Sequence, residues 1–161
     1  MILKPYEDFL QQPLAFWIAN ANASHEPDLA RCTGIAPFTD LEHLTFFIPE
    51  KSNAHILANA TINSQLTLSA TSVITYNSYQ FKGVINAIRD CTQQEEEIQN
   101  RYLKEFSLVV SKLGFSKETF FELYNFQPSR AITFHVTEIF EQSPHKGTGN
   151  LVTKKEEAHG S

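Results

Sequence analysis

Between residues 14 and 91, short apolar runs alternate with turn residues, and one helical stretch opening at Lys51, Ser52 and Asn53 interrupts them. Runs of this length with period-2 alternation predict strands, and the short turns between them predict an antiparallel barrel or sandwich. The first turn of a helix has unpaired backbone N–H groups and carries the positive end of the helix dipole. A helix start that offers a lysine and a serine among strands is therefore a candidate anion-binding site.

The expected fold class is mainly β with flanking helices. Gly34 interrupts the second strand, where a glycine typically marks a bulge or a close approach to a ligand. Thr92 and Glu95 predict a capping box for the long helix, whose acidic residues 95–97 are interpreted as a solvated first turn. The apolar stripe of that helix is expected to cover one side of the barrel. The predicted strands cover residues 14–21, 28–38, 43–48, 63–75, 79–91 and 130–141, and the predicted helices residues 5–12, 52–60, 92–113 and 116–124.

The bulk composition fits one domain. A chain of 161 residues that is 42% hydrophobic can bury a core, and we expect one domain over residues 1–150 and a flexible tail over residues 151–161. The 13 Phe and 5 Tyr predict an aromatic-rich core or a subunit interface. Net charge −5 argues against a nucleic-acid partner, which requires a basic face.

The cellular setting is inferred from what the sequence does not contain. No apolar run approaches the roughly 20 residues that span a bilayer, so no membrane partner is expected. The first residues do not show the charged-then-apolar pattern of a signal peptide. Two cysteines, Cys32 and Cys91, are too few for a disulfide scaffold and have no metal-binding spacing. A reducing, cytoplasmic setting is the expectation.

Familiar catalytic signatures are absent from the sequence, which contains no GxSxG, HExxH, P-loop or GxGxxG. His43 and His55 fall on different predicted elements and are interpreted as a half-exposed strand residue and a helix-surface residue. His135 lies between apolar residues and is interpreted as structural. Cys32 follows Arg31 but has no neighbouring histidine, so we interpret it as a small packing residue rather than a nucleophile.

The remaining candidates form one constellation of polar and basic residues. Alternate residues of a strand point to the same face, so Arg31 and Thr33 are expected to share one face, and Gln80 and Lys82 another. The helix start adds charge, a hydroxyl and free amide groups. Each residue alone is more often an ordinary solvent-exposed side chain. The candidate site consists of Arg31, Thr33, Lys51, Ser52, Asn53, Gln80 and Lys82.

Over most of its length, from about residue 14 to residue 150, the chain resembles the pyridoxamine 5′-phosphate oxidase-like family of FMN-binding split barrels. The order of strands with one short helix after the third matches that family. The segment Tyr79-Gln80-Phe81-Lys82-Gly83 looks like the family's Gln-x-x-Gly-type strand. The segment Phe140-Glu141-Gln142-Ser143-Pro144 looks like a Phe-x-Gln-Thr-Pro stretch common in its members.

The resemblance implies a six-stranded antiparallel split β-barrel of Greek-key type, homodimeric, with FMN at the subunit interface. It places Arg31 at the family's phosphate-binding arginine and Ser52 at the serine of its Ser-Arg-Lys helix start. Asn53 and Ala54 replace the two cations of that motif, and Ala36 replaces a lysine on the second strand. Each lost cation removes a charge-assisted hydrogen bond of about 1.5–3 kcal/mol, part of which Lys51 or Lys82 can replace.

Three functions remain open at this point. The first is an FMN-dependent oxidoreductase acting on an unknown small molecule, with Gln80 or Lys82 near the flavin ring. The second is a non-catalytic flavin or haem binder on the same barrel. The third is a dimeric barrel without a cofactor. Haem or a deazaflavin can replace FMN, because all three occur on similar barrels.

Overall fold

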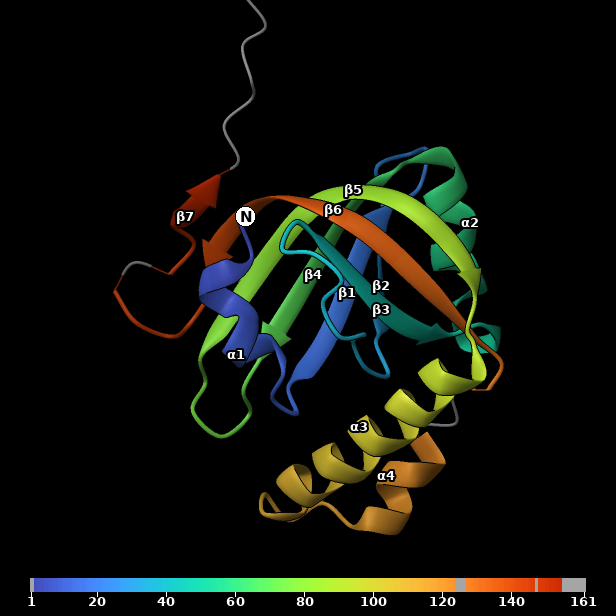
Figure 1. Cartoon of the computed structure of the whole chain (residues 1–161), viewed down its shortest axis with the longest axis vertical. Coiled ribbons are helices and arrows are strands. Elements are labelled where there is room, and N and C mark those ends of the chain that lie inside the picture. Colours follow the sequence, from blue (N-terminus) through green and yellow to red (C-terminus); the bar gives the residue numbers. More distant parts are fainter. Residues whose placement is uncertain (1, 124–126, 147, 155–161) are drawn as a thin grey trace, which may run out of the picture.

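The computed structural model describes residues 2–123, 127–146 and 148–154. An antiparallel sheet, strongly curled, dominates the fold (Figure 1), with the strand order β2-β1-β4-β5-β6-β3 and β7 paired with β6. This confirms the mainly β fold class. The strands are β1 (Ala15–Ala21), β2 (Pro27–Arg31), β3 (His43–Pro49), β4 (Gln65–Thr71), β5 (Ser78–Asp90), β6 (Ser129–Glu141) and β7 (Leu151–Lys154).

Alternation along the strands separates the two faces of the sheet. On β1, Phe16 and Ile18 are fully buried, whereas Trp17 between them is only half-buried. The same period of two recurs on β4, where Leu66 and Leu68 face the core. Buried aromatic side chains fill much of the interior, which confirms the predicted aromatic-rich core.

The second predicted strand, residues 28–38, is two segments in the structure. β2 ends at Arg31, and the chain then leaves β1 to pair with β3, through a bond of 2.8 Å from the Thr33 N–H to the Phe47 carbonyl. Further bonds join Gly34 and Ala36 to β3. Residues 32–36 therefore link the two ends of the curled sheet.

Two glycines have structural reasons in the fold itself. Gly34 has φ +134°, a backbone conformation that other residues rarely adopt, although a Cβ there would make only an ordinary contact with the Tyr102 side chain at 3.4 Å. A Cβ on Gly83 would lie 1.9 Å from the His135 carbonyl oxygen of β6, where the β5–β6 register shifts. The glycine of the Gln-x-x-Gly-type segment thus permits two strands to approach each other.

Helices cover the ends of the sheet and one side of it (Figure 1). α3 begins at the predicted capping box of Thr92 and Glu95, and it packs Tyr102, Leu103 and Phe106 into the core, which confirms that it covers the barrel. The helical elements are η1 (Lys4–Tyr6), α1 (Glu7–Leu10), η2 (Lys51–Asn53), α2 (Ala54–Ile62), α3 (Gln93–Ser111) and α4 (Lys117–Leu123).

The first turn of α3 differs from its predicted role. Glu95 is 9% exposed, and its carboxylate makes two bonds of 2.6 and 2.7 Å with the Arg89 guanidinium. These bonds hold the pKa of Glu95 below its ordinary value. The interpretation of residues 95–97 as a solvated turn is therefore wrong for Glu95, while Glu97 is exposed.

The C-terminal region adds one strand to the six that the sequence predicts. β7 lies within the predicted tail and pairs with the end of β6. The remaining tail residues, 155–161, lie outside the described residues. Within the described part of the chain, no helix has the length and apolar character needed to cross a bilayer.

Candidate functional site

Arg31 and Gln80 belong to one row of side chains that crosses the outer face of the sheet. Successive strand pairings place Arg31 opposite Trp17, Trp17 opposite Ser69, Ser69 opposite Gln80, and Gln80 opposite Phe140. We call these five residues the outer row. Neighbouring strands are about 4.8 Å apart, so Arg31 and Gln80 are about 14 Å apart along this row. The two predicted site strands therefore present side chains to the same outer face.

Lys82 lies in the next row on this face. It faces Thr67 on β4 and Glu138 on β6, and its ammonium nitrogen lies 4.5 Å from the centre of the Phe140 ring. The predicted shared face of Gln80 and Lys82 is confirmed. Beside Lys82 is a hollow of about 310 Å³, lined by polar and small residues of β1 and β4 such as Asn20 and Thr67.

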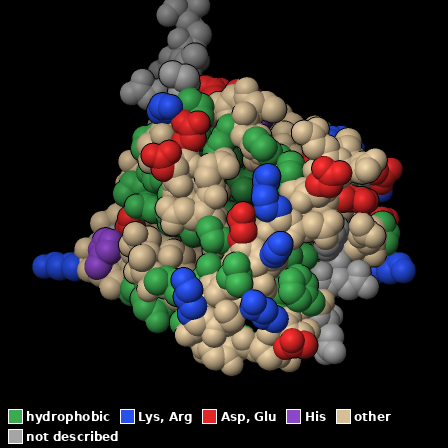
Figure 2. Space-filling view, turned by 60° about the horizontal axis from the view of Figure 1, so that its bottom comes forward, with side chains coloured by type: hydrophobic (Ala, Val, Ile, Leu, Met, Phe, Trp, Pro, Cys, Tyr) green, Lys and Arg blue, Asp and Glu red, His purple; other side chains and the backbone are tan. Residues whose placement is uncertain are grey.

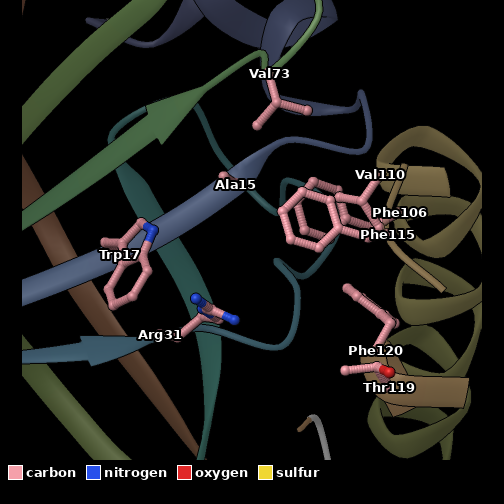
Figure 3. A pocket seen from close by; sticks show the side chains of 9 residues that line it. All are labelled: Ala15, Trp17, Arg31, Val73, Phe106, Val110, Phe115, Thr119 and Phe120. Carbon is pink, nitrogen blue, oxygen red and sulfur yellow. The ribbon is translucent and has the colours of Figure 1, made fainter. Parts of the chain in front are cut away.

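Arg31 is exposed at the end of β2, and its guanidinium carbon lies 4.6 Å from the centre of the Trp17 ring. Both residues line a pocket of about 270 Å³ between the sheet and the helices α3 and α4 (Figure 3). We call this the aromatic pocket. Its lining residues are Ala15, Trp17, Arg31, Val73, Phe106, Val110, Phe115, Thr119 and Phe120.

Thr33 does not share the outer face with Arg31, so that expectation is wrong. Its side chain is 1% exposed, and its hydroxyl donates to the Gln99 side-chain oxygen at 2.7 Å. Strand alternation ends at Arg31 because Cys32 and Thr33 both turn inward where the chain moves from β1 to β3. Thr33 is therefore part of a buried polar contact between the barrel and α3.

The helix start contains two exposed residues and one buried residue. Lys51 and Ser52 are exposed on η2, directly after β3. Asn53 is 6% exposed, and its amide donates to the Pro49 carbonyl at 2.7 Å and to the Ser52 hydroxyl at 3.1 Å. The helix predicted over residues 52–60 begins later in the structure, because α2 begins at Ala54 and no side chain caps it.

α2 is fixed to the sheet at the far end of β1 and β2. The Asn20 amide donates to the Ile56 carbonyl at 3.0 Å, and the Asn59 amide donates to the Asp28 carboxylate at 2.6 Å. Arg31 lies three residues after Asp28 on β2. Two residues further along, the Thr33 N–H donates to the carbonyl of Phe47, near the end of β3, and η2 follows β3 directly. The structure thus leaves Arg31, Lys51, Ser52, Gln80 and Lys82 as candidate ligand contacts and gives Thr33 and Asn53 internal partners.

Neither cysteine has the setting of a nucleophile. Complete burial raises the pKa of the Cys32 thiol well above its ordinary value, which confirms its role as a packing residue. Burial also raises the pKa of Cys91, which is half-buried at the end of β5. Both thiols are therefore neutral near pH 7.

His43 and His135 face each other across β3 and β6, with ring centres 5.0 Å apart. His43 also bonds to the Asp40 carboxylate at 3.1 Å, while Glu42 lies 3.7 Å from His135. Backbone N–H groups of residues 42 and 43 contribute to a lowered pKa of Asp40. Among the described residues, no group of three or more potential ligands has a metal-binding arrangement.

The sequence did not predict the aromatic pocket. Its aromatic wall comes from α3 and α4, whose position against the outer face depends on tertiary packing. Trp17 was recognisable in principle, because the hairpin that pairs Ala21 with Pro27 also places Trp17 opposite Arg31. A register argument from that turn would have joined the two residues.

No family model and no curated protein matches the sequence. The fold, in contrast, has many solved counterparts, and 60 chains of solved structures match it. HupZ from Group A Streptococcus is 13% identical, with a TM-score of 0.55 over 93% of this chain and 99% of that one. An F420 reductase is 14% identical, with a TM-score of 0.54 over 84% of this chain and 96% of that one.

A third counterpart names the family. It is a protein related to general stress protein 26, of the pyridoxinephosphate oxidase family, from Clostridium acetobutylicum. It is 10% identical, with a TM-score of 0.53 over 91% of this chain and 96% of that one. The resemblance read from the sequence is therefore confirmed for the fold: this chain has the curled antiparallel barrel of the pyridoxamine 5′-phosphate oxidase-like proteins.

Proposed function

We propose that the protein binds the phosphate of FMN at Arg31 and the η2 turn, and that it is a flavin-dependent oxidoreductase acting on a small molecule. The observation that carries the proposal is the position of Arg31, which is exposed at the end of β2 and lies in one row with Gln80. Lys51 and Ser52 add a second cation and a hydroxyl on an exposed turn. A guanidinium and an ammonium are the side chains that bind phosphate most strongly.

The isoalloxazine ring would lie along the outer face, toward Gln80 and Lys82. Both side chains are half-buried on this face and can donate hydrogen bonds. A bound flavin supplies the electron transfer, and the protein positions the ring and stabilises negative charge on it. Two hydrogen bonds hold the elements that carry the site. The Asn53 amide fixes η2 through its bond to the Pro49 carbonyl, and the Thr33 backbone N–H fixes the chain after β2 through its bond to the Phe47 carbonyl.

The first experiment is a titration of the purified protein with FMN and with riboflavin, followed by absorption and flavin fluorescence. If the phosphate site is as proposed, FMN binds at least tenfold more tightly than riboflavin. The double variant Arg31→Ala, Lys51→Ala lowers FMN affinity to the riboflavin level, since each charge-assisted bond contributes about 1.5–3 kcal/mol. Equal affinities for the two flavins in the unmodified protein would refute the phosphate site.

Arg101→Ala and Lys104→Ala provide the matched control. Both residues are exposed on α3 and do not line the aromatic pocket. Removing them changes the net charge as much as the double variant does, so FMN affinity should stay within a factor of two. A similar loss in both variants would indicate a general charge effect.

A deazaflavin is the second cofactor to test, because an F420 reductase shares the fold. Haem is the third. Reduction of the bound flavin by a nicotinamide donor, followed by reoxidation with turnover, would support an enzyme. A coloured protein that no donor reduces would be a non-catalytic binder, which the replacement of three family cations by Ala36, Asn53 and Ala54 favours.

We also propose that the protein is a homodimer. Leu29 on β2 is 59% exposed and Ile62 on α2 is 67% exposed, on two elements that pack together. Exposed apolar side chains of this size often lie in subunit interfaces. Light scattering at micromolar concentration should give twice the monomer mass, and a stable monomer would contradict the proposal.

A further inference from the structure

We propose that the aromatic pocket binds a small aromatic carboxylate, with its ring among the phenylalanines and its carboxylate on Arg31. The proposal goes beyond flavin binding and does not require it, but the two ligands share Arg31, so FMN and the carboxylate are expected to compete. It rests on the composition of the pocket wall, on the placement of Arg31 and on the size of the cavity.

Four of the nine described residues that line the pocket are aromatic. Phe106 and Phe120 are buried and meet edge to face, with ring centres 5.7 Å apart. Phe115, in the turn between α3 and α4, and Trp17, on the sheet, close two further sides (Figure 3). Aromatic rings prefer edge-to-face and offset contacts with other rings, so this wall suits an aromatic ligand better than a branched aliphatic one.

Arg31 supplies the charge selection. It is the one charged residue among the nine described residues that line the pocket. Figure 3 shows its guanidinium pointing from β2 into the space between the sheet and α4. The Trp17 ring contacts the guanidinium at 4.6 Å and thereby limits its orientation. A planar guanidinium binds a carboxylate through two parallel N–H donors, and an arginine fixed in this way loses less side-chain entropy on binding.

The volume restricts the ligand to one ring or two fused rings. An apolar cavity of about 150 Å³ holds benzene. The aromatic pocket measures about 270 Å³, so a phenyl ring with a short carboxylate chain fits it. Figure 2 shows apolar side chains among charged ones on the face that is turned forward. Leu113 and Phe115, which follow α3 in the chain, are exposed.

Trp17 makes the test direct, because it is the only tryptophan in the chain and it lines the pocket. The probe is 3-phenylpropanoate, compared with the neutral 3-phenylpropanol and the cationic 3-phenylpropylamine. The carboxylate should quench or shift the Trp17 fluorescence with saturation and bind at least tenfold more tightly than the alcohol. The amine should not bind. Isothermal titration calorimetry gives the affinities independently.

Arg31 belongs to both proposed sites, so variants of Lys51 and Val110 are what separate the pocket from the flavin site. Arg31→Leu should lower the affinity for 3-phenylpropanoate at least tenfold, and Arg31→Lys should restore only part of it. Val110→Phe places a ring inside the pocket and should also weaken binding, whereas Arg101→Leu, an exposed arginine outside the pocket, should not. Lys51→Ala should weaken FMN binding but leave 3-phenylpropanoate binding unchanged.

Several results would overturn the proposal. One is equal binding of the three probes, or no saturable binding of any of them. Another is an equal loss for Lys51→Ala and Arg31→Leu, which would place the carboxylate at the flavin-phosphate site. If the affinity for 3-phenylpropanoate falls as the protein concentration rises, a second copy of the chain competes for the pocket and is its occupant. Failure of FMN binding with retained 3-phenylpropanoate binding would remove only the proposed flavin function.

Discussion

The guanidinium carbon of Arg31 and the ring of Trp17 lie 4.6 Å apart, on directly opposed residues of the β1–β2 hairpin. Cation–π contacts at exposed sites contribute about 0.5–1 kcal/mol. In a double-mutant cycle, Arg31→Leu and Trp17→Leu should therefore show a coupling energy of this size in urea denaturation. A coupling near zero would mean that the two side chains separate in solution. Because Trp17 is the sole tryptophan, far-UV circular dichroism follows the unfolding of all four proteins.

Thr33 and Gln99 form a buried bond of 2.7 Å between the barrel and α3. Thr33→Val should lower the free energy of unfolding by about 1–3 kcal/mol, because it leaves the Gln99 oxygen without its donor. It should not change FMN affinity, since Thr33 does not reach the outer face. Thr39→Val, at an exposed loop position, is the control and should leave the free energy of unfolding nearly unchanged. A loss of FMN affinity without a loss of stability would return Thr33 to the cofactor site.

Glu95 links the start of α3 to Arg89 at the end of β5. Because the pKa of Glu95 is lowered in the folded protein, its charge stabilises the fold above the ordinary pKa of 4.5. This contribution is lost as the pH falls through the lowered value. Arg89 is 48% exposed, so solvent screening limits the cost of Glu95→Gln at neutral pH to about 1 kcal/mol.

The pH dependence supplies the measurement. Urea denaturation of the native protein and of Glu95→Gln should give free energies of unfolding that converge as the pH is lowered below 4.5. Glu97→Gln, in the same turn but exposed, should show no such convergence. A Glu95→Gln difference that stays constant down to acid pH would show that the carboxylate charge is not what stabilises the helix start.

Gly83 allows β5 and β6 to approach each other at the register shift. A Cβ would lie 1.9 Å from the His135 carbonyl oxygen, and that atom belongs to a central strand that cannot move freely. Gly83→Ala should lower the free energy of unfolding by about 3 kcal/mol, because overpacking an interior that cannot move is destabilising. Asn86→Ala, exposed on the same strand, should change thermal stability little. A Gly83→Ala protein as stable as the native one would require another local arrangement of the two strands.

Strands that form apolar runs between turn residues were predictable from the sequence alone, even where their alternation is imperfect. The predicted strands 43–48 and 130–141 differ from β3 (His43–Pro49) and β6 (Ser129–Glu141) by one residue. The predicted strand 28–38 failed because the chain changes its pairing partner after Arg31. Such an exchange depends on β3 being present beside it, which no local pattern contains.

The candidate site was predictable where one continuous strand decides orientation. Gln80 and Lys82 lie on one strand, and alternation placed them on one face. Thr33 was misplaced because the same rule was applied across the end of β2. Glu95 was misjudged because its partner Arg89 lies on the preceding strand, so an acidic first turn that normally faces solvent became a buried ion pair.

The placement of β3 between residues 32–36 and β6 has a consequence for the growing chain. β3 finds one partner almost at once, but its other neighbour, β6, begins only at Ser129. Until the ribosome has released that strand, the N–H and C=O groups along one side of β3 lack their partner strand. Exposed strand edges of this kind are where nascent chains aggregate or recruit chaperones. Any truncation that ends before β6 should thus produce insoluble protein rather than a smaller barrel.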